Sequence, residues 1–363
     1  MDTTRLTAPV ALITGASHGI GRETAALLAL NGFRVYGTSR NSENVPPIPG
    51  VTLLNLDVQS QGSIRSCVED VIASAGQIDV LINNAGMVGP GSASEELDIQ
   101  RVRDLFETNF FGAVQVTNAV LPYMRERGRG TVINISSASG LVALPPFFTF
   151  YAASKHALEA YTEGLRYEVA PFGITVVAVE PGYTDTGIID SVEDPDHPIA
   201  AYSKARMATT LLNRAGIRYG SRPERTARTV LRVLRQEHPA LRHPTGFDAL
   251  AIGWLRRFTP APLFEALGRW MFLTWKPRLT QDETAHEPGM QDIPTPNELG
   301  LHRILFHGPT LNRTIQLGFG LAGLVTAAAA LKFIARSQAH HAVTSGLFRH
   351  IQRSVGAVNQ RLE

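Results

Sequence analysis

The chain has 363 residues, of which 44% are hydrophobic and 18% are charged, and this globular composition excludes a wholly disordered protein. The net charge of +2 lacks the basic excess of nucleic-acid-binding proteins, so we expect no nucleic-acid partner. The single cysteine, Cys67, excludes an intrachain disulfide, and residues 1–19 show no secretory pattern, so we expect a cytoplasmic protein.

Strand and helix patterns alternate from residue 9 to about residue 245. Apolar, β-rich runs predict strands at 10–14, 34–38, 51–57, 79–83, 130–136 and 174–180. Helical patterns lie near 20–31, 62–75, 99–124, 151–170 and 222–237. Continuously apolar strands separated by helices indicate a parallel sheet with helices on both faces. With right-handed crossovers, the prediction is an α/β protein with a doubly wound parallel sheet of the Rossmann type.

A glycine-rich turn, TGASHGIG at residues 14–21, directly follows the first predicted strand. Gly15, Gly19 and Gly21 allow a tight turn and a close approach of the backbone to a pyrophosphate. The helix that begins at Ile20 points its N-terminal amides at the same anion, and His18 adds a further donor. The placement between strand and helix predicts a dinucleotide phosphate site, with a flexible loop as the alternative.

Ser39 and Arg40 follow the second predicted strand, where NAD-binding folds of this type place an acid on the adenosine ribose. A guanidinium at this position can hold a 2′-phosphate through a charge-assisted fork, which favours NADP(H). The alternative is a solvated surface arginine.

Polar residues also follow the third and fourth predicted strands. Asp57, next to Val58, closes the third strand and is expected to hydrogen-bond the adenine, and NNAG at residues 83–86 ends the fourth. Because open α/β sheets bind ligands at the carboxyl ends of their strands, both segments are expected to border the cofactor. The alternative for each is a turn built on Asx hydrogen bonds.

Tyr151 and Lys155 are four residues apart in a predicted helix and therefore share one helix face. A phenol has a pKa near 10, too high for efficient proton transfer at neutral pH, and a neighbouring ammonium lowers it. Lysine, of which the chain has only four, also suits a hydrogen bond to a ribose hydroxyl. Ser137, at the end of the fifth predicted strand, is placed to donate to a substrate carbonyl. Asn109 is placed to hold a water that connects Lys155 to solvent.

Five motifs occur in order, namely TGASHGIG, NNAG, the helix with Asn109, NISSASG at 134–140 and YAASK at 151–155, followed by PGYTDT at 181–186. Through them the chain resembles the short-chain dehydrogenase/reductase family over about residues 8–275. The resemblance implies that Tyr151 is the general acid/base and that Lys155 orients the nicotinamide ribose. It implies further that Ser137 polarises the carbonyl, that Asn109 completes the proton relay and that PGYTDT holds the nicotinamide carboxamide. The predicted cofactor-binding residues are Gly15, Ser17, His18, Gly19, Ile20, Gly21, Ser39, Arg40, Asp57, Val58, Asn83, Asn84, Ala85, Gly86, Tyr151, Lys155, Pro181, Gly182, Thr184 and Thr186.

One spacing departs from the family's commonest pattern. Ser137 lies fourteen residues before Tyr151, one more than usual, and the segment LPPFFTF at 144–150 is the candidate for the extra residue. Ser137 and Ser139 would lie on the same side of an extended strand, so the choice between them stays open. We favour Ser137, the second serine of the Asn-x-Ser-Ser frame.

The expected function is reversible hydride transfer between NADP(H) and a carbonyl or secondary alcohol. Phe147, Phe148 and Phe150, with the region of Trp254 and Phe258, indicate an apolar pocket for a small lipophilic ketone or alcohol such as a steroid, retinoid or polyketide. The alternative is an NADP(H)-binding sensor or scaffold without turnover. No metal site is expected, because the tail histidines His340, His341 and His350 lack carboxylate or cysteine partners.

Residues 1–275 are the predicted catalytic domain. The two segments that follow it differ from it and from each other in composition. Residues 276–299 are proline-rich and acidic and are typical of a linker, whereas residues 300–363 are basic and partly apolar and predict a helical tail. The stretch 315–335 is expected either to contact a membrane or to pack against a second subunit in a homo-oligomer. Residues 187–220, expected to close over the substrate, carry no readable pattern.

Overall fold

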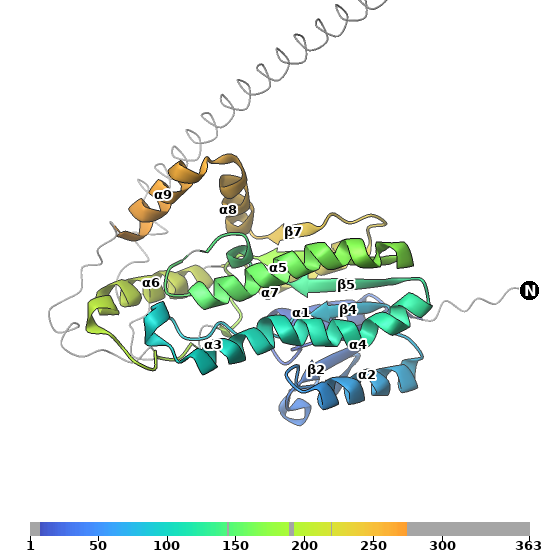
Figure 1. The fold of residues 1–363 in the computed structure, drawn as a ribbon. Coiled ribbons are helices and arrows are strands. Elements are labelled where there is room, and N and C mark those ends of the chain that lie inside the picture. Colours follow the sequence, from blue (N-terminus) through green and yellow to red (C-terminus); the bar gives the residue numbers. More distant parts are fainter. Residues whose placement is uncertain (1–7, 144, 189–191, 219, 274–363) are drawn as a thin grey trace, which may run out of the picture. The chain divides into compact units, whose positions relative to one another are not determined.

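The computed structural model describes residues 8–273 apart from 144, 189–191 and 219, and its centre is one parallel sheet (Figure 1). The strand order is β3-β2-β1-β4-β5-β6-β7, and each neighbouring pair is parallel. The strands are β1 (Val10–Ile13), β2 (Arg34–Ser39), β3 (Val51–Asn55), β4 (Val80–Asn83), β5 (Gly130–Ile135), β6 (Ile174–Pro181) and β7 (Arg242–Thr245).

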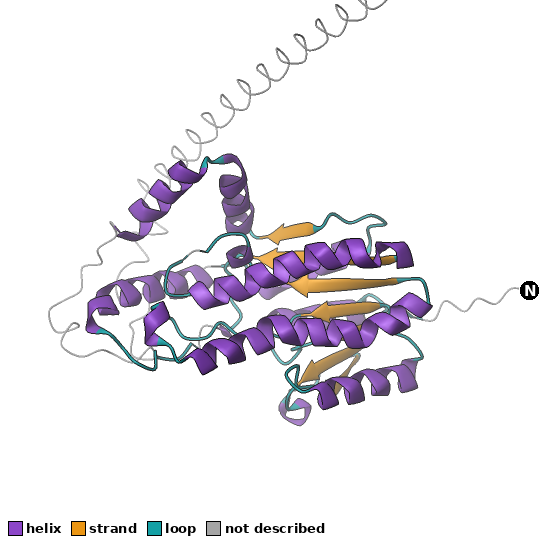
Figure 2. Cartoon of the chain, in the orientation of Figure 1, coloured by secondary structure: helices purple, strands orange, loops and turns teal. Residues whose placement is uncertain are grey.

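Helices connect and cover these strands (Figure 2). Local signals set several of their ends. For α2, the Ser60 hydroxyl accepts from the Ser63 amide at the start, and Gly76 ends the helix with a left-handed φ of 73°. The helices are α1 (Gly19–Leu30), α2 (Gln61–Ala75), α3 (Ile99–Phe106), α4 (Gly112–Glu126), α5 (Thr149–Val169), α6 (Ala200–Arg218), α7 (Pro223–Leu234), α8 (Phe247–Phe258) and α9 (Ala261–Leu273).

Alternate strand residues enter two apolar cores on opposite faces of the sheet. In β1, Val10 and Leu12 belong to the core that is closed by α2, α4 and α5. Ala11 and Ile13 belong to the core that is closed by α1 and α7. Each face of the sheet is thereby buried, which confirms the doubly wound α/β fold with helices on both faces.

The parallel arrangement brings the carboxyl ends of the central strands to one edge of the sheet. The Thr14 amide, just after β1, donates to the Ile82 carbonyl of β4 at 3.0 Å. The Ser136 amide, just after β5, donates to the Val179 carbonyl of β6 at 2.8 Å. The loops that leave β1, β4, β5 and β6 therefore begin side by side, and they form the candidate site described below.

Three elements differ from the sequence expectation. The predicted helix 99–124 is two helices, α3 and α4, joined by a π turn at Glu107–Phe111. Residues 200–218, which carry no readable pattern, form α6. Residues 242–245, which lie beyond the last predicted strand, form the seventh strand, and α8 and α9 follow it.

The predicted linker 276–299 and tail 300–363 lie outside the described residues, and so does the predicted membrane or subunit contact at 315–335. Among the helices of the described part, none is long and apolar enough to cross a membrane.

Candidate active site

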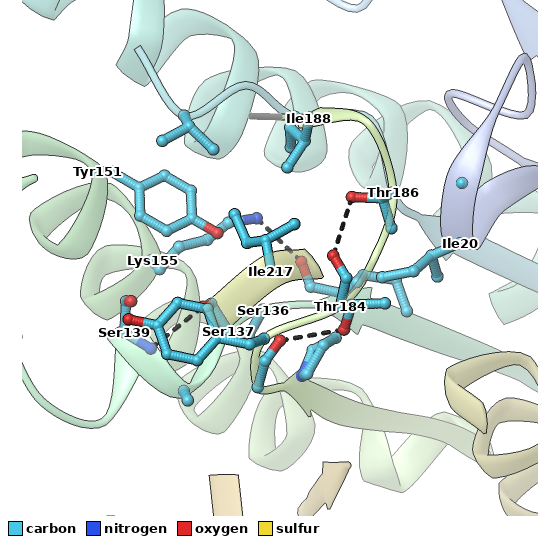
Figure 3. Close-up of a pocket in the computed structure, with 18 of the residues that line it drawn as sticks. Ile20, Ser136, Ser137, Ser139, Tyr151, Lys155, Thr184, Thr186, Ile188 and Ile217 are labelled. Carbon is cyan, nitrogen blue, oxygen red and sulfur yellow. Dashed lines mark hydrogen bonds between the residues drawn. The ribbon is translucent and has the colours of Figure 1, made fainter. Parts of the chain in front are cut away.

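A cavity of about 380 Å³ lies at the carboxyl edge of the sheet. Figure 3 shows side chains from separate elements gathered round it, among them Ser137, Tyr151 and Lys155. The predicted site residues that line the cavity are Gly15, His18, Gly19, Ile20, Asn84, Ala85, Gly86, Ser137, Tyr151, Lys155, Pro181, Gly182, Thr184 and Thr186.

The glycine-rich turn packs tightly against the end of β4. A Cβ on Gly21 would lie 2.2 Å from the Gly15 carbonyl oxygen, so only glycine fits there. Gly15 itself has a φ of 68°, and a Cβ on it would lie 2.9 Å from the Ala85 Cα. The Asn84 side-chain amide fixes the turn by donating to the Thr14 and Gly15 carbonyls at 2.9 and 2.8 Å.

Helix α1 begins in this turn without a side-chain cap. The residue before it, His18, makes no capping hydrogen bond to the helix, and its Nδ1 lies 2.8 Å from the Ser17 hydroxyl. The first amides of a helix form a binding site for anions when no side chain occupies them. The turn, the start of this helix and the cavity beside them fit the diphosphate of a dinucleotide.

Lys155 is buried on the inner face of α5, with 5% of its surface exposed, and its Nζ donates to the Ile135 carbonyl at 3.0 Å. The Nζ lies 5.9 Å from the centre of the Tyr151 ring, so the two groups face each other as their spacing predicts. Burial lowers the pKa of Lys155 from 10.5 to about 8, and the Glu159 carboxylate opposes this by favouring the ammonium form.

Burial raises the pKa of the Tyr151 phenol above its ordinary value of 10, and a hydrogen bond with the Ser137 side chain only partly offsets it. The expectation that the ammonium of Lys155 lowers this pKa is therefore not met in this structure, because the desolvation of the phenolate outweighs the favourable contacts. The phenol keeps its proton at neutral pH. In this state Tyr151 is a proton donor rather than a base.

Ser137 and Ser139 both line the cavity, but they have different roles in the local structure. The side chain of Ser137 lowers the pKa of Tyr151, and its Oγ accepts the Ser139 main-chain amide at 3.1 Å, which starts the short turn Ala138–Gly140. The contact with Tyr151 favours Ser137 as the partner of the phenol.

Asn109 lies in the π turn between α3 and α4 and is buried. Its side chain is fully engaged: Oδ1 accepts from the Met87 amide at 2.8 Å, and Nδ2 donates to the Met87 carbonyl and the Ser154 hydroxyl at 2.8 and 3.0 Å. A Cβ on Gly86 would lie 3.2 Å from Asn109 Oδ1 and 3.6 Å from Lys155 Nζ, so Asn109 and Lys155 converge on Gly86. Asn109 thus fixes the loop after β4 beside Lys155 without lining the cavity itself.

Other predicted residues also lie away from the cavity. The Asn83 amide donates to Thr117 and Asn134 inside the protein, at 2.9 and 2.8 Å, and Val58 is buried against Gly112. Asp57 forms the Asx turn given above as its alternative, since its Oδ1 accepts from the Gln59 amide at 3.0 Å. Those outside the cavity lining are Ser17, Gly21, Ser39, Arg40, Asp57, Val58, Asn83 and Asn109.

The segment after β6 closes the cavity over the glycine turn. A Cβ on Gly19 would lie 3.1 Å from the Thr186 Cβ, so the two loops are in contact. The Thr184 and Thr186 hydroxyls donate to the carbonyls of Gly182 and Thr184 at 3.0 and 3.4 Å, which holds this segment in a compact turn.

The wall opposite the glycine turn is mainly apolar. Phe148 lines it as expected, together with Val142, Ile188, Ile217 and Ile252. Trp254 and Phe258, which the sequence places near the pocket, instead lie on the outer face of α8 with 65% and 50% of their surfaces exposed. The inner face of the same helix supplies Asp248 and Ile252 to the cavity.

The sequence placed the regions of α6 and α8 near the substrate, but it did not identify which of their residues line the cavity. Asn213 and Ile217 of α6 reach the cavity, and Tyr183 donates its hydroxyl to the Asn213 side chain at 2.7 Å. Motif reading does not find such residues, because substrate-facing segments have no fixed pattern. In the described part of the chain, no group of three or more His, Cys, Asp or Glu side chains is placed to hold a metal ion.

Comparison with known proteins gives concordant matches. The family model described as short chain dehydrogenase matches residues 9–196. The 3-ketodihydrosphingosine reductase of Bacteroides thetaiotaomicron is 40% identical over 240 residues, which make up 65% of this chain and 87% of that protein. The family match includes the glycine turn, Tyr151 and Lys155, whereas α6 and α8 lie beyond it.

Solved structures match over a longer part of the chain. A short-chain dehydrogenase from Streptomyces avermitilis is 34% identical with a TM-score of 0.63, and the match covers 74% of this chain and 97% of that one. A short chain dehydrogenase from Burkholderia cenocepacia, solved in complex with NADP, is 27% identical with a TM-score of 0.58, with 73% and 99% covered.

Proposed function

The chain belongs to the short-chain dehydrogenase family and is an oxidoreductase, and from this we propose that it reduces the carbonyl group of lipophilic molecules with NADPH. The observation that carries the proposal is the convergence of Ser137, Tyr151 and Lys155 on the cavity that the glycine-rich turn also lines. Carbonyl reduction requires a proton donor, a cation and a binding site for the dinucleotide, and here they lie beside one apolar wall.

The reaction adds a hydride to the carbonyl carbon and a proton to the carbonyl oxygen. Bound NADPH supplies the hydride. The Tyr151 hydroxyl gives its proton to the oxygen as negative charge develops there, and Ser137 donates a hydrogen bond to the same oxygen. The ammonium of Lys155 stabilises the phenolate that is left and hydrogen-bonds the cofactor ribose. Asn109 holds the loop at Gly86 in place beside Lys155.

The protonated state of Tyr151 supports reduction as the direction that we propose. Because burial raises the pKa of Tyr151, the phenol carries its proton at neutral pH and is ready to donate it. Oxidation of an alcohol needs the phenolate as a base, and burial disfavours that form. The resting site therefore has Tyr151 in the protonation state that carbonyl reduction requires.

NADP(H) is the cofactor that we propose, because Arg40 is an exposed cation directly after β2, in place of the acid that binds an unphosphorylated ribose. The NADP complex of the similar Burkholderia cenocepacia protein supports this choice. His18 lies in the glycine turn on the cavity, and we propose it as a second hydrogen-bond donor to the same phosphate.

The substrate class that we propose is a long-chain 3-oxo compound. The apolar wall formed by Val142, Phe148, Ile188, Ile217 and Ile252 suits an alkyl chain next to the reacting carbonyl. The name of the Bacteroides thetaiotaomicron relative, a 3-ketodihydrosphingosine reductase, supports a substrate of that kind.

A direct test is to measure NADPH oxidation by the purified full-length chain with a series of 3-oxo compounds of increasing alkyl length. We expect kcat/KM to rise with chain length and the product to be the 3-hydroxy compound, identified by mass spectrometry. Steroid ketones and retinal serve as the comparison, since the fused rings of the one and the conjugated polyene of the other are rigid and test shape rather than hydrophobicity. Tight NADPH binding without reduction of any ketone would support a non-catalytic sensor instead.

A further inference from the structure

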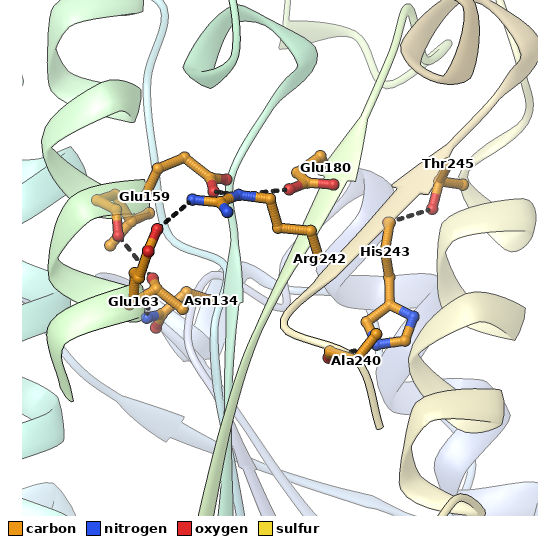
Figure 4. A network of polar contacts seen from close by, with 10 residues as sticks. Asn134, Glu159, Glu163, Glu180, Ala240, Arg242, His243 and Thr245 are labelled. Atoms are coloured by element: carbon orange, nitrogen blue, oxygen red, sulfur yellow. Dashed lines mark hydrogen bonds and ion pairs between the residues drawn. The ribbon is translucent and has the colours of Figure 1, made fainter. Parts of the chain in front are cut away.

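Behind the active site lies a cluster of carboxyl groups around a single arginine (Figure 4). Glu159 and Glu163 come from α5, Glu180 from β6 and Arg242 from β7. The Arg242 Nε donates to Glu159 Oε2 at 2.9 Å, and its Nη2 donates to Glu163 Oε2 at 2.8 Å. Glu180 Oε1 lies 3.6 Å from the same Nε, beyond hydrogen-bond distance.

Glu180 is completely buried, and neither of its oxygens has a hydrogen-bond partner among the described residues. Glu159 is 5% exposed, and its Oε1 likewise has no hydrogen-bond partner among the described residues. Burial, followed by the charge of Glu159, raises the pKa of Glu180 to about 8, while Arg242 opposes the rise. Glu180 therefore holds a proton at neutral pH. Glu159 and Glu163 are the two residues whose carboxyl oxygens accept hydrogen bonds from Arg242.

The cluster is connected to the active site through one turn of α5. Lys155 and Glu159 are four residues apart on that helix and are both buried. Burial alone disfavours the ammonium of Lys155, and Glu159 is the neighbouring charge that opposes it. Glu163, one turn further on, is half-exposed and has no such effect on Lys155.

We propose that Glu159, which is buried one helical turn from Lys155 and is held by Arg242, is a positioning residue that keeps Lys155 in its ammonium form. The role in catalysis rests on the proposed function, because it is the charged Lys155 that supports proton donation by Tyr151. The cluster thus sets the pH above which the site loses its cation.

The charged and titratable groups that face this unit come from three elements of the described chain. Tyr151 and Glu163 lie on α5 with Lys155 and Glu159, and Glu180 and Arg242 face them from β6 and β7. From β5, the Ile135 carbonyl accepts the hydrogen bond of Lys155.

The test measures the titration of Lys155 directly. The chain has four lysines, so isotope-labelled lysine gives four sets of NMR signals, and the Lys155→Arg variant identifies that of Lys155. In full-length Glu159→Gln, the titration midpoint of Lys155 is expected to move toward acid by about one pH unit or more. Glu159→Leu, which leaves no unpaired polar atom at this position, is the second variant and is expected to show the same direction.

Glu163→Gln is the matched control, since it removes the same charge from the same arginine one helical turn away. The titration midpoint of Lys155 in Glu163→Gln is expected to stay within a few tenths of a pH unit of the wild-type value. The same result is expected for Glu180→Gln, because below pH 8 the wild-type Glu180 is itself uncharged. An unchanged midpoint in both Glu159 variants, or an equal shift in Glu163→Gln, would overturn the proposal.

A second measurement relates the cluster to catalysis. In Glu159→Gln the alkaline fall of kcat/KM for ketone reduction is expected to begin about one pH unit lower than in the wild type, with little change at pH 6. A uniform loss at every pH would mean a merely structural role and would overturn the proposed role. Because the NMR titration needs no turnover, a shifted Lys155 midpoint in a chain that reduces no ketone would refute the proposed function and leave the electrostatic inference intact.

Discussion

Ser137 and Ser139 have the same hydroxyl group and lie two residues apart, yet their neighbours differ. The side chain of Ser137 lowers the pKa of Tyr151, whereas Ser139 supplies its main-chain amide to the Ser137 oxygen. The sequence leaves the two serines as alternatives because the spacing from Tyr151 does not favour one serine over the other. The turn Ala138–Gly140 distinguishes them by directing one side chain at the phenol.

Replacing each serine by alanine tests this difference. Ser137→Ala is expected to lower kcat for ketone reduction by about 100-fold or more, since it removes a donor to the developing oxyanion. Ser139→Ala keeps the main-chain amide and is expected to stay within a few-fold of the wild type. Steady-state kinetics with NADPH would show the contrast. Equal losses in the two variants would contradict the assignment.

Arg40 is the residue on which the cofactor preference depends. Arg40→Ala is expected to raise KM for NADPH about 10- to 100-fold and to leave KM for NADH nearly unchanged, because a charge-assisted contact with the 2′-phosphate is lost. Arg34→Ala is the matched control, since Arg34 is an exposed arginine at the opposite end of the same strand. A similar rise in KM for both cofactors in Arg40→Ala would show that Arg40 does not bind the 2′-phosphate.

Several site residues were predictable because their chemistry needs a fixed spacing. Lys155 follows Tyr151 by one helical turn, and Gly15 and Gly21 sit where a side chain would collide with the backbone. The pKa of Tyr151 was not predictable in this way. Sequence spacing reveals the neighbouring cation, but it does not reveal how completely the phenol is removed from water.

At the scale of elements, α6 is held over the cavity by a buried ion pair. Glu96 has no exposed surface and accepts from the amides of Ala93 and Ile199 at 2.7 and 2.8 Å, and it pairs with Arg206 of α6. Burial raises the pKa of Glu96, but these hydrogen bonds outweigh it and lower the pKa below its ordinary value of 4.5. Glu96 therefore connects the loop after β4 to the helix that supplies Ile217 to the cavity.

Glu96→Ala is expected to destabilise the protein by about 3–5 kcal/mol, because it breaks a buried ion pair and removes the acceptor of two main-chain amides. It should also raise KM for the ketone more than KM for NADPH. Urea denaturation and steady-state kinetics measure the two effects. Glu95→Ala, at an exposed neighbour that accepts from the Tyr202 hydroxyl, is the control and is expected to cost less than about 1 kcal/mol.

The same pair predicts a pH dependence of stability. Since the pKa of Glu96 is lower in the folded state, its contribution is complete above about pH 4.5 and is lost as the pH falls through the folded-state value. The wild type should therefore lose more stability than Glu96→Gln on acidification below pH 4.5. Parallel acid sensitivity in the two proteins would contradict this role of Glu96.

The elements that the sequence did not predict share a physical cause. β7 is the short edge strand Arg242–Thr245, with a charged and a proline residue in place of an apolar run, and pairing with β6 sets its conformation. The π turn at Glu107–Phe111 interrupts a continuous helical pattern, and it places Asn109 beside Met87. In both cases tertiary contacts outweigh local propensity.

At the scale of the whole molecule, the described residues that line the cavity all lie between Gly15 and Ile252. A chain that ends at Arg278 is therefore expected to keep the kcat/KM of the full-length protein within about threefold. Kinetic assays of the two chains test this directly. A truncated chain that folds but reduces no ketone would show that the remaining residues take part in the site.

We propose that residues 300–363, with their basic and partly apolar composition, serve attachment to a membrane or to a second subunit. The full-length chain is then expected to sediment with anionic vesicles or to elute as a homo-oligomer, and the chain ending at Arg278 is expected to lose that property. Identical vesicle binding and identical size of the two chains would contradict a role of the tail in either contact.

The central claim is that the Tyr151 hydroxyl donates the proton when a ketone is reduced in this cavity. It is tested most directly by ketone-dependent NADPH oxidation in the full-length Tyr151→Phe variant, with NADPH binding measured on the same preparation. We predict that the rate falls by about 100- to 10,000-fold while the affinity for NADPH is retained. Reduction at the wild-type rate in Tyr151→Phe would contradict the claim.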